Sequence, residues 1–240
     1  MKLLEMNTLD FQEAMKNQDT VILPSGACEV WGPHLPLGAD TIVAEEMANR
    51  LAEEMGWIVG PTLPVGDSLM VWGPGTVAVR PESFRNYLED ICLSLVKHGF
   101  KRFCFMNPHV GNVPLIAQTA AKMKMEYSVD SCLFDWWRFI EPLCDREGIL
   151  DNRGAMAHGH ASEAGTSVLL YLRPDLVKME RAVRTEPKKV NPFPDIGVFW
   201  PIPSLTDTLM IGDATGATRE KGQKIVEKGL ERMIAFLKQW

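Results

Sequence analysis

The sequence predicts a three-layer α/β/α fold of the α/β class, in which a mostly parallel central sheet lies between two layers of helices. Three units of strand, loop and helix follow one another along residues 21–125. Right-handed crossovers join the parallel strands of such units, so their helices cover both faces of one sheet. The composition, 46% hydrophobic and 23% charged, is typical of a globular protein and excludes a disordered chain. No linker or internal repeat divides the sequence, so we expect a single domain over residues 1–240.

The first unit begins with a short apolar strand at 21–26 that ends in glycine. Residues 28–40 follow with several prolines and glycines, which predict a loop. Residues 41–55 place alanine, methionine and leucine side chains on one helical face, and Gly56 is the expected end of that helix.

The second unit has a strand at 57–61 and a loop over 66–79. Its helix runs from 81 to about 98, with proline in the first turn and Gly99 as the expected end. The third unit has a strand at 102–106, a polar loop at 107–112 and a helix over 113–125. A fourth strand is expected at 129–134.

Periodicity weakens after Asp135, and only two further helices are expected, over 163–172 and 217–240. Residues 156–163 are expected to form the loop before the first of these helices. Residues 184–205 hold five prolines and little periodicity, so we expect a long surface excursion there.

Ligand-type side chains follow the ends of the predicted parallel strands, which meet at one edge of the sheet. Four of the five histidines lie in polar loops, and imidazole and carboxylate groups are common ligands of zinc, manganese and iron. Glu29, Asp40 and His109 form the best ligand set, which would leave one coordination position open for water. The alternative is that Asp40 caps the next helix, that Glu29 is a loop carboxylate and that His109 is a turn residue.

Other polar and aromatic residues of these loops have two interpretations each. His158 and His160 could supply further ligands or a general base, and Glu163 could cap the helix that it begins. Tryptophans at predicted loop positions could form the walls of a small-molecule pocket or pack in the core, namely Trp31, Trp72, Trp136, Trp137 and Trp200. Cys28 has no evident activating neighbour, and we expect a packed thiol.

Five blocks, in order, resemble the creatininase (creatinine amidohydrolase) family. Residues 23–40 resemble its first block, whose core is E-x-H-G-P-H-L-P-L-x-T-D, and residues 73–76 resemble F-P-G-T. Residues 107–112 resemble N-G-H-G-G-N. Residues 160–177 are similar to H-A-G-x-x-E-T-S followed by P-E-L-V, and residues 212–218 to G-D-P-x-x-A-T.

The resemblance implies an α/β/α fold, a metal site at the strand ends, hydrolysis of small amides and a homo-oligomer, often a hexamer. By the resemblance, Glu29, Asp40 and His109 would hold a divalent metal, zinc or manganese or else iron. His160 matches a histidine of the family's catalytic region and could carry the proton, with Glu163 or His34 assisting.

The departures from the family pattern fall on its second metal. Trp31 stands at the histidine of E-x-H, Gly165 at the glutamate of E-T-S, and Gly111 where creatininase itself has a ligating glutamate. Met70 stands near a histidine of many members. We therefore expect one metal per chain, with Trp31 as a wall of the pocket.

The expected function is hydrolysis of a small polar, cyclic substrate at a C–N bond by a metal-activated water. The alternatives are hydrolytic ring opening of an oxidised inositol or cyclic ketone at a C–C bond, and a non-catalytic binding member of the family. A net charge of −6 argues against nucleic acid as the main partner. No apolar run reaches the roughly 18 residues of a membrane span. Five cysteines without a CxxC pair, and no signal peptide, favour the cytoplasm.

Overall fold

Four parallel strands form the central sheet of the computed structural model, which describes residues 1–193 and 195–240. Across the sheet the order is β2, β1, β3, β4, and each neighbouring pair is parallel. The bounds are β1 (Thr20–Pro24), β2 (Ile58–Val59), β3 (Arg102–Asn107) and β4 (Asp130–Asp135). The predicted parallel sheet is confirmed, and the carboxyl ends of its strands share one edge.

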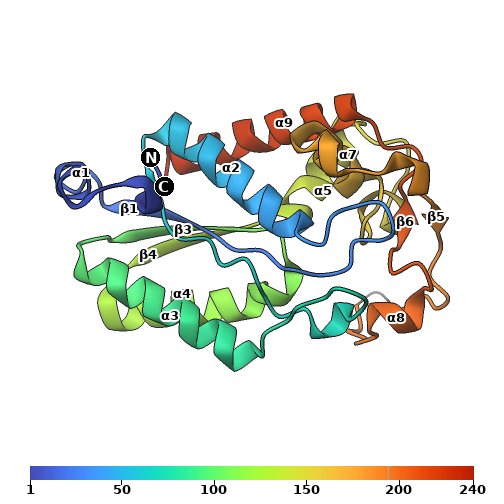
Figure 1. The fold of residues 1–240 in the computed structure, drawn as a ribbon, viewed down its shortest axis with the longest axis horizontal. Helices are drawn as coiled ribbons and strands as arrows, with labels where there is room; N and C mark the ends of the chain where they lie inside the picture. The colour runs from blue at the N-terminus through green and yellow to red at the C-terminus, as the bar shows by residue number, and fades with distance from the viewer. Residues whose placement is uncertain (194) are drawn as a thin grey trace.

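Side chains of the strands alternate between two hydrophobic clusters, so both faces of the sheet are buried. In β1, Val21 and Leu23 belong to one cluster and Ile22 to the other. Figure 1 shows helices on both faces of the sheet. The Ile22 face is covered by α2 (Ala39–Met55) and α9 (Arg219–Leu237), and the opposite face by α3 (Pro81–Lys97) and α4 (Val113–Tyr127). These four helices agree with the predicted helices to within a few residues.

Two more helices lie on the α9 side of the sheet: α5 (Trp136–Glu147) and α7 (Glu163–Leu172). The sequence predicted α7, but it did not predict α5. The short helices are α1 (Thr8–Ala14), α6 (Ala155–His158) and α8 (Ile202–Leu205). The single turns of 3₁₀-helix are η1 (Leu3–Glu5), η2 (Leu69–Val71), η3 (Val110–Asn112), η4 (Pro174–Leu176) and η5 (Met179–Arg181).

Residues 184–193 and 195–205 lie at the surface with none of them buried, as the prolines of 184–205 predicted. Between α7 and α9, β5 (Arg184–Thr185) pairs antiparallel with β6 (Gly212–Asp213). Among the described residues, no helix combines the length and the apolar character that crossing a membrane requires.

Candidate active site

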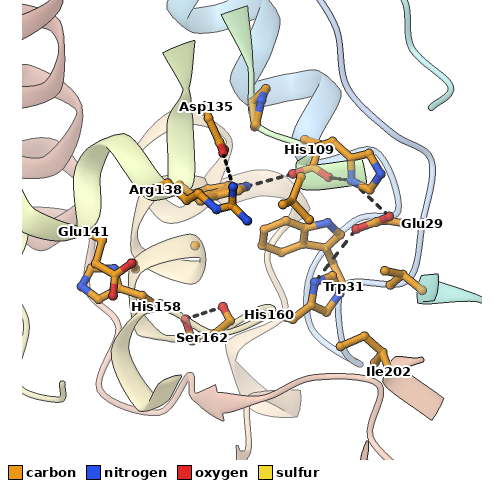
Figure 2. A pocket seen from close by; sticks show the side chains of 18 residues that line it. Glu29, Trp31, His109, Asp135, Arg138, Glu141, His158, His160, Ser162 and Ile202 are labelled. Atoms are coloured by element: carbon orange, nitrogen blue, oxygen red, sulfur yellow. Dashed lines mark hydrogen bonds and ion pairs between the residues drawn. The ribbon is translucent and has the colours of Figure 1, made fainter. Parts of the chain in front are cut away.

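A cavity of about 350 Å³ opens at the carboxyl edge of the sheet. This volume lies within the range of roughly 300 to 1,000 Å³ that is usual for small-molecule sites. Its walls come from the loops after β1 and β3, the end of β4, and helices α5 to α7. Ligand-type, aromatic and charged side chains all reach it, as Figure 2 shows.

Three buried side chains converge at one end of this cavity. His109 Nδ1 lies 3.3 Å from Glu29 Oε2 and 3.3 Å from Asp40 Oδ2. One potential ligand atom from each residue lies within 4.8 Å of the others, so the group could hold a metal ion. Glu29 follows β1, Asp40 lies in the first turn of α2, and His109 follows β3. The structure thus brings together the three residues that the sequence grouped as ligands.

Hydrogen bonds from neighbouring loops fix the orientation of His109 and Asp40. His109 Nε2 donates to the carbonyl of Asp67 at 2.7 Å, which turns Nδ1 toward the two carboxylates. Trp137 Nε1 donates to Asp40 Oδ1 at 3.1 Å. Gly38 is the residue before the helix and Asp40 makes no cap hydrogen bond, so the capping alternative for Asp40 is wrong.

A second set of hydrogen bonds holds the loop that carries His109. Asn107 Nδ2 donates to the backbone carbonyl of His109 at 2.6 Å. Asn112 Nδ2 donates to the carbonyl of Gly26, and Ser25 Oγ donates to Asn107 Oδ1. The amide groups of the N-P-H-V-G-N block thus join the loops after β1 and β3, which is the local reason for this sequence pattern.

The electrostatics of the three groups favour a cation between the carboxylates. Burial opposes the charge on His109, but the two carboxylates 3.3 Å from Nδ1, those of Asp40 and Glu29, together outweigh it and raise the pKa of His109 well above its ordinary value. Burial raises the pKa of Asp40. At Glu29 burial also opposes the charge, but the neighbouring His109 and His160 together outweigh it and lower the pKa. Glu29 Oε2 is buried without a hydrogen-bond partner among the described residues. The donor set therefore fits a divalent metal, which would replace the proton on Nδ1.

His160 and Trp31 line the cavity beside Glu29. His160 Nε2 donates to the carbonyl of Val30 at 2.6 Å, and its Nδ1 lies 4.0 Å from Glu29 Oε1. The rings of Trp31 and His160 have centroids 4.9 Å apart. Trp31 therefore lies in the pocket wall, where the sequence expected it.

Four other residues that the sequence suggested for the site are absent from the cavity wall, and these expectations are corrected. His34 is buried behind the wall, where its Nε2 forms a 2.8 Å hydrogen bond with Thr166 Oγ1. Glu163 is buried and accepts hydrogen bonds from the backbone N–H groups of residues 151 and 152 and from Lys221. Trp136 is fully buried against α9, and Trp72 is 57% exposed.

Sequence reasoning named Trp137 among the candidate pocket tryptophans but missed the charged wall that α5 contributes. Asp135, Trp137, Arg138 and Glu141 line the cavity, and His158 of α6 lies near Glu141 (Figure 2). The available signal was the position of Asp135 directly after the predicted strand 129–134, at the same edge as His109. Trp137, not Trp136, supplies the second indole of the pocket, because Trp136 points into the core.

Comparison with known proteins agrees with this geometry. The family model for creatininase, described as creatinine amidohydrolase, matches residues 4–237. Creatinine amidohydrolase of Pseudomonas putida is 29% identical over 93% of this chain and 90% of its own length. 3-dehydro-scyllo-inosose hydrolase of Thermotoga maritima is 30% identical over 78% of this chain and 61% of its own length. A mycofactocin precursor peptide peptidase of Mycolicibacterium smegmatis is 29% identical over 92% of this chain and 85% of its own length.

Solved structures share the whole fold. A crystal structure of creatininase superposes with a TM-score of 0.89 at 24% identity, covering 99% of this chain and 96% of the other. A manganese creatininase gives a TM-score of 0.87 at 23% identity, covering 99% and 97% of the two chains. The family match spans Glu29, Asp40 and His109 and nearly all of the sequence. The chain therefore belongs to the creatininase family of metal-dependent hydrolases.

Proposed function

We propose that the protein hydrolyses a small polar, cyclic substrate at a C–N bond, with a divalent metal held by Glu29, Asp40 and His109. The observation that carries this proposal is the convergence of three buried ligand-type groups at one end of a cavity. When bound there, zinc or manganese would lower the pKa of a water molecule and polarise the substrate carbonyl. Iron is a further candidate for the same oxygen and nitrogen donors.

His160 is the residue that we propose for proton transfer. A carbonyl oxygen can only accept, so the hydrogen bond to Val30 places the proton of a neutral imidazole on Nε2. Nδ1 is then an acceptor, and it lies 4.0 Å from Glu29 Oε1 beside the cavity. His160 can thus take a proton at Nδ1 from a group bound next to Glu29 and return it to a leaving nitrogen.

We further propose one metal per chain, because the positions of the family's second site are filled or closed. A Cβ atom on Gly165 would lie 2.7 Å from Cζ3 of the Trp31 indole. A Cβ atom on Gly111 would lie 2.1 Å from the carbonyl oxygen of Asp67. Neither glycine can carry a ligating side chain without movement of its neighbour, and an indole does not ligate zinc.

A second candidate is hydrolytic ring opening of an oxidised inositol or cyclic ketone at a C–C bond. The Thermotoga maritima relative, 3-dehydro-scyllo-inosose hydrolase, supports this second candidate, because it is 30% identical over 78% of this chain. The end of the cavity that holds Glu29, Asp40 and His109 would serve both reactions, because each needs a polarised carbonyl and an activated water. The products of a substrate panel distinguish the two reactions. Hydrolysis of a ring C–N bond gives an amine and a carboxylate on one open chain, whereas hydrolysis of a C–C bond beside a ketone gives a carboxylate and a new C–H bond.

The test of the proposed function is a comparison of Asp40→Ala with Cys28→Ala. We expect Asp40→Ala to lose the bound metal and nearly all turnover, because it removes a buried ligand carboxylate. Cys28 lies outside the cavity wall, with its thiol 3.8 Å from the carbonyl of Gly75, so Cys28→Ala should retain both. The measurements are metal content of protein purified without chelator and hydrolysis of a panel of cyclic amides and ketones.

Two outcomes would contradict the proposal. A wild-type protein with no bound metal and no thermal shift on addition of zinc or manganese would indicate a non-catalytic binding member of the family. Loss of turnover in Cys28→Ala with the metal still bound would instead indicate thiol chemistry.

A further inference from the structure

The proposed reaction leaves one charged wall of the cavity unexplained. Asp135, Arg138 and Glu141 line the cavity from the end of β4 and from α5. Spacing of three residues places Arg138 and Glu141 on one face of α5. Figure 2 shows Asp135 and Arg138 in contact, with Glu141 and His158 farther from the metal end.

Arg138 has hydrogen-bond donors that remain available to a ligand. It is the one lysine or arginine among the described residues that line the cavity. Its contact with Asp135 is a single ion pair, Nη1 to Oδ2 at 3.5 Å, and its side chain is 68% exposed. A guanidinium group has five N–H donors, and this ion pair involves one of its three nitrogens, so donors remain available to a ligand in the cavity.

The groups around Arg138 supply acceptors and a further polar atom. Asp135 and Glu141 lie three residues before and three residues after it, and their carboxylates only accept hydrogen bonds when ionised. The side chain of His158 is 5% exposed, and its Nε2 makes no hydrogen bond among the described residues. The nearest charged partner of that nitrogen is Asp145 Oδ1 at 3.7 Å. Donors and acceptors therefore alternate along the wall.

The balance of charge disfavours an anionic ligand. The charge of Arg138 is offset by that of Asp135, and a dication would offset Glu29 and Asp40. Glu141 then leaves a small negative excess, which repels an anion. A hydroxyl group suits such a wall better, because it donates to a carboxylate and accepts from a guanidinium at the same time.

A ring with hydroxyl groups also has apolar C–H groups, and two indoles of the cavity offer these an apolar surface. Trp31 and Trp137 line the same cavity with ring centroids 5.4 Å apart. Aromatic faces pack against the C–H groups of a small ring, while polar groups at the edge fix its orientation.

We propose that Asp135, Arg138 and Glu141 bind the hydroxyl groups of a neutral, hydroxyl-rich ring, and that Arg138 is a specificity-determining residue for the substrate. This inference rests on the proposed function, since it describes the part of the substrate that lies away from the metal. It does not depend on which bond is cleaved, and it holds equally for a polyhydroxylated amide and a polyhydroxylated ketone.

The test measures binding of four probes to the zinc-loaded protein by calorimetry and saturation-transfer NMR. The probes are myo-inositol, cyclohexanol, glutarate and 1,4-diaminobutane, which represent a polyol ring, a ring with one hydroxyl, a dianion and a dication. We expect myo-inositol to bind more tightly than the other three. Arg138→Met should weaken its binding at least about tenfold, because hydrogen bonds to a charged group are lost.

Arg146→Met is the matched control, because Arg146 lies on the same helix, pairs with Glu147 and is absent from the cavity wall. It should leave binding of myo-inositol unchanged. Equal binding of myo-inositol by the wild type and Arg138→Met, or no binding of it at all, would overturn the inference. Arg138-dependent binding of glutarate in its place would show an anion site, and preferred binding of 1,4-diaminobutane would show a cation site.

Metal content of the same samples separates this inference from the proposed function. A protein with Asp40-dependent metal binding and turnover but no Arg138-dependent polyol binding would overturn the inference alone. Arg138-dependent binding of myo-inositol in a protein without metal or turnover would overturn the proposed hydrolysis. It would still support binding of hydroxyl groups by Asp135, Arg138 and Glu141.

Discussion

The indole of Trp31 lies against the backbone of Gly165, at the place where a side chain on residue 165 would extend. The two residues therefore form a complementary pair: a large ring on one side requires a missing side chain on the other. Trp31→His alone would open space without supplying a second ligand. Zinc sites in enzymes normally have three protein ligands, so that variant lacks a tight second site.

We predict one metal per chain in the wild type and in Trp31→His, and a second, weaker metal only in the Trp31→His/Gly165→Glu double variant. Elemental analysis and titration with a zinc indicator measure the stoichiometry. Gly165→Glu alone is the control, and we expect it to be destabilised because its Cβ would meet the indole at 2.7 Å. Two metals per wild-type chain would show that other residues build the second site.

Titration of the buried His34 side chain makes a testable contribution to the pH dependence of stability. Burial lowers the pKa of His34 from 6.5 to about 4, so the folded protein binds this proton less readily than the unfolded chain. Its stabilising effect is therefore complete above about pH 6.5 and is lost as the pH falls toward 4. Over that range the loss amounts to roughly 2 to 3 kcal/mol, since one pKa unit is worth about 1.4 kcal/mol.

Denaturant unfolding at about pH 7.5 and about pH 4.5 measures this effect through the difference between variants. We expect His34→Gln to be less stable than the wild type at the higher pH and to lose less stability on acidification. His98→Gln, at an exposed position on the surface, is the control and should follow the wild type. An unchanged pH dependence in His34→Gln would contradict the assignment.

Residue-level prediction succeeded where position along the chain determines position in space. Glu29 and His109 follow parallel strands that end at one edge, so their convergence with Asp40 followed from the order of the elements. The sequence could not predict which way a loop side chain points. His34 lies in the same loop as Glu29, yet it turns toward Thr166 and away from the cavity.

Helix α5 is the longest element that the sequence did not predict among the described residues, and it carries the wall around Arg138. Pro142 lies inside it, and a proline within a helix removes one hydrogen bond and normally predicts a break. The helix persists because Trp136, Ile140, Leu143 and Cys144 are buried on one face. Tertiary packing outweighed local preference here. The residues proposed to select the substrate were therefore hidden from analysis of the sequence.

Glu163 connects three elements rather than acting in the cavity. Its carboxylate, on the first residue of α7, accepts from Lys221 Nζ of α9 at 2.6 Å. It also accepts from the backbone N–H groups of Asp151 and Asn152 at 2.9 and 3.0 Å. These contacts outweigh burial and lower the pKa of Glu163. The network holds the loop that leads into α6, and so supports the cavity from behind.

We predict that Glu163→Gln lowers the free energy of unfolding by about 3 kcal/mol, because it leaves the mostly buried Lys221 ammonium with the exposed Asp151 as its remaining anionic partner. Denaturant titration measures this loss, and metal content should stay unchanged. Glu231→Gln is the control on α9, since it breaks an exposed pair with Lys228 and should cost less than about 1 kcal/mol. Loss of turnover with unaltered stability would instead restore a catalytic role for Glu163.

At the scale of the whole molecule, two segments each expose four large apolar side chains, in addition to exposed apolar residues elsewhere. Leu69, Met70, Trp72 and Val77 lie in and after η2. Phe193, Ile196, Val198 and Phe199 precede α8, which contacts η2. A surface of this kind indicates a protein partner. We propose that the partner is a second copy of the chain, as the creatininase resemblance implies, and that the assembly is a hexamer.

The oligomer is testable through the mass of the protein in solution. Light scattering coupled to size-exclusion chromatography should give about six times the 26.9 kDa of one chain for the wild type. Trp72→Ser/Phe199→Ser should shift the mass toward the monomer, because two anchors with exposed fractions of 57% and 87% lose their apolar contact area. Met125→Ser, equally exposed at 84% but on α4, should leave the assembly intact. A wild-type mass of one chain would contradict the proposal, and an effect of Met125→Ser alone would place the interface on the α3 and α4 side of the sheet.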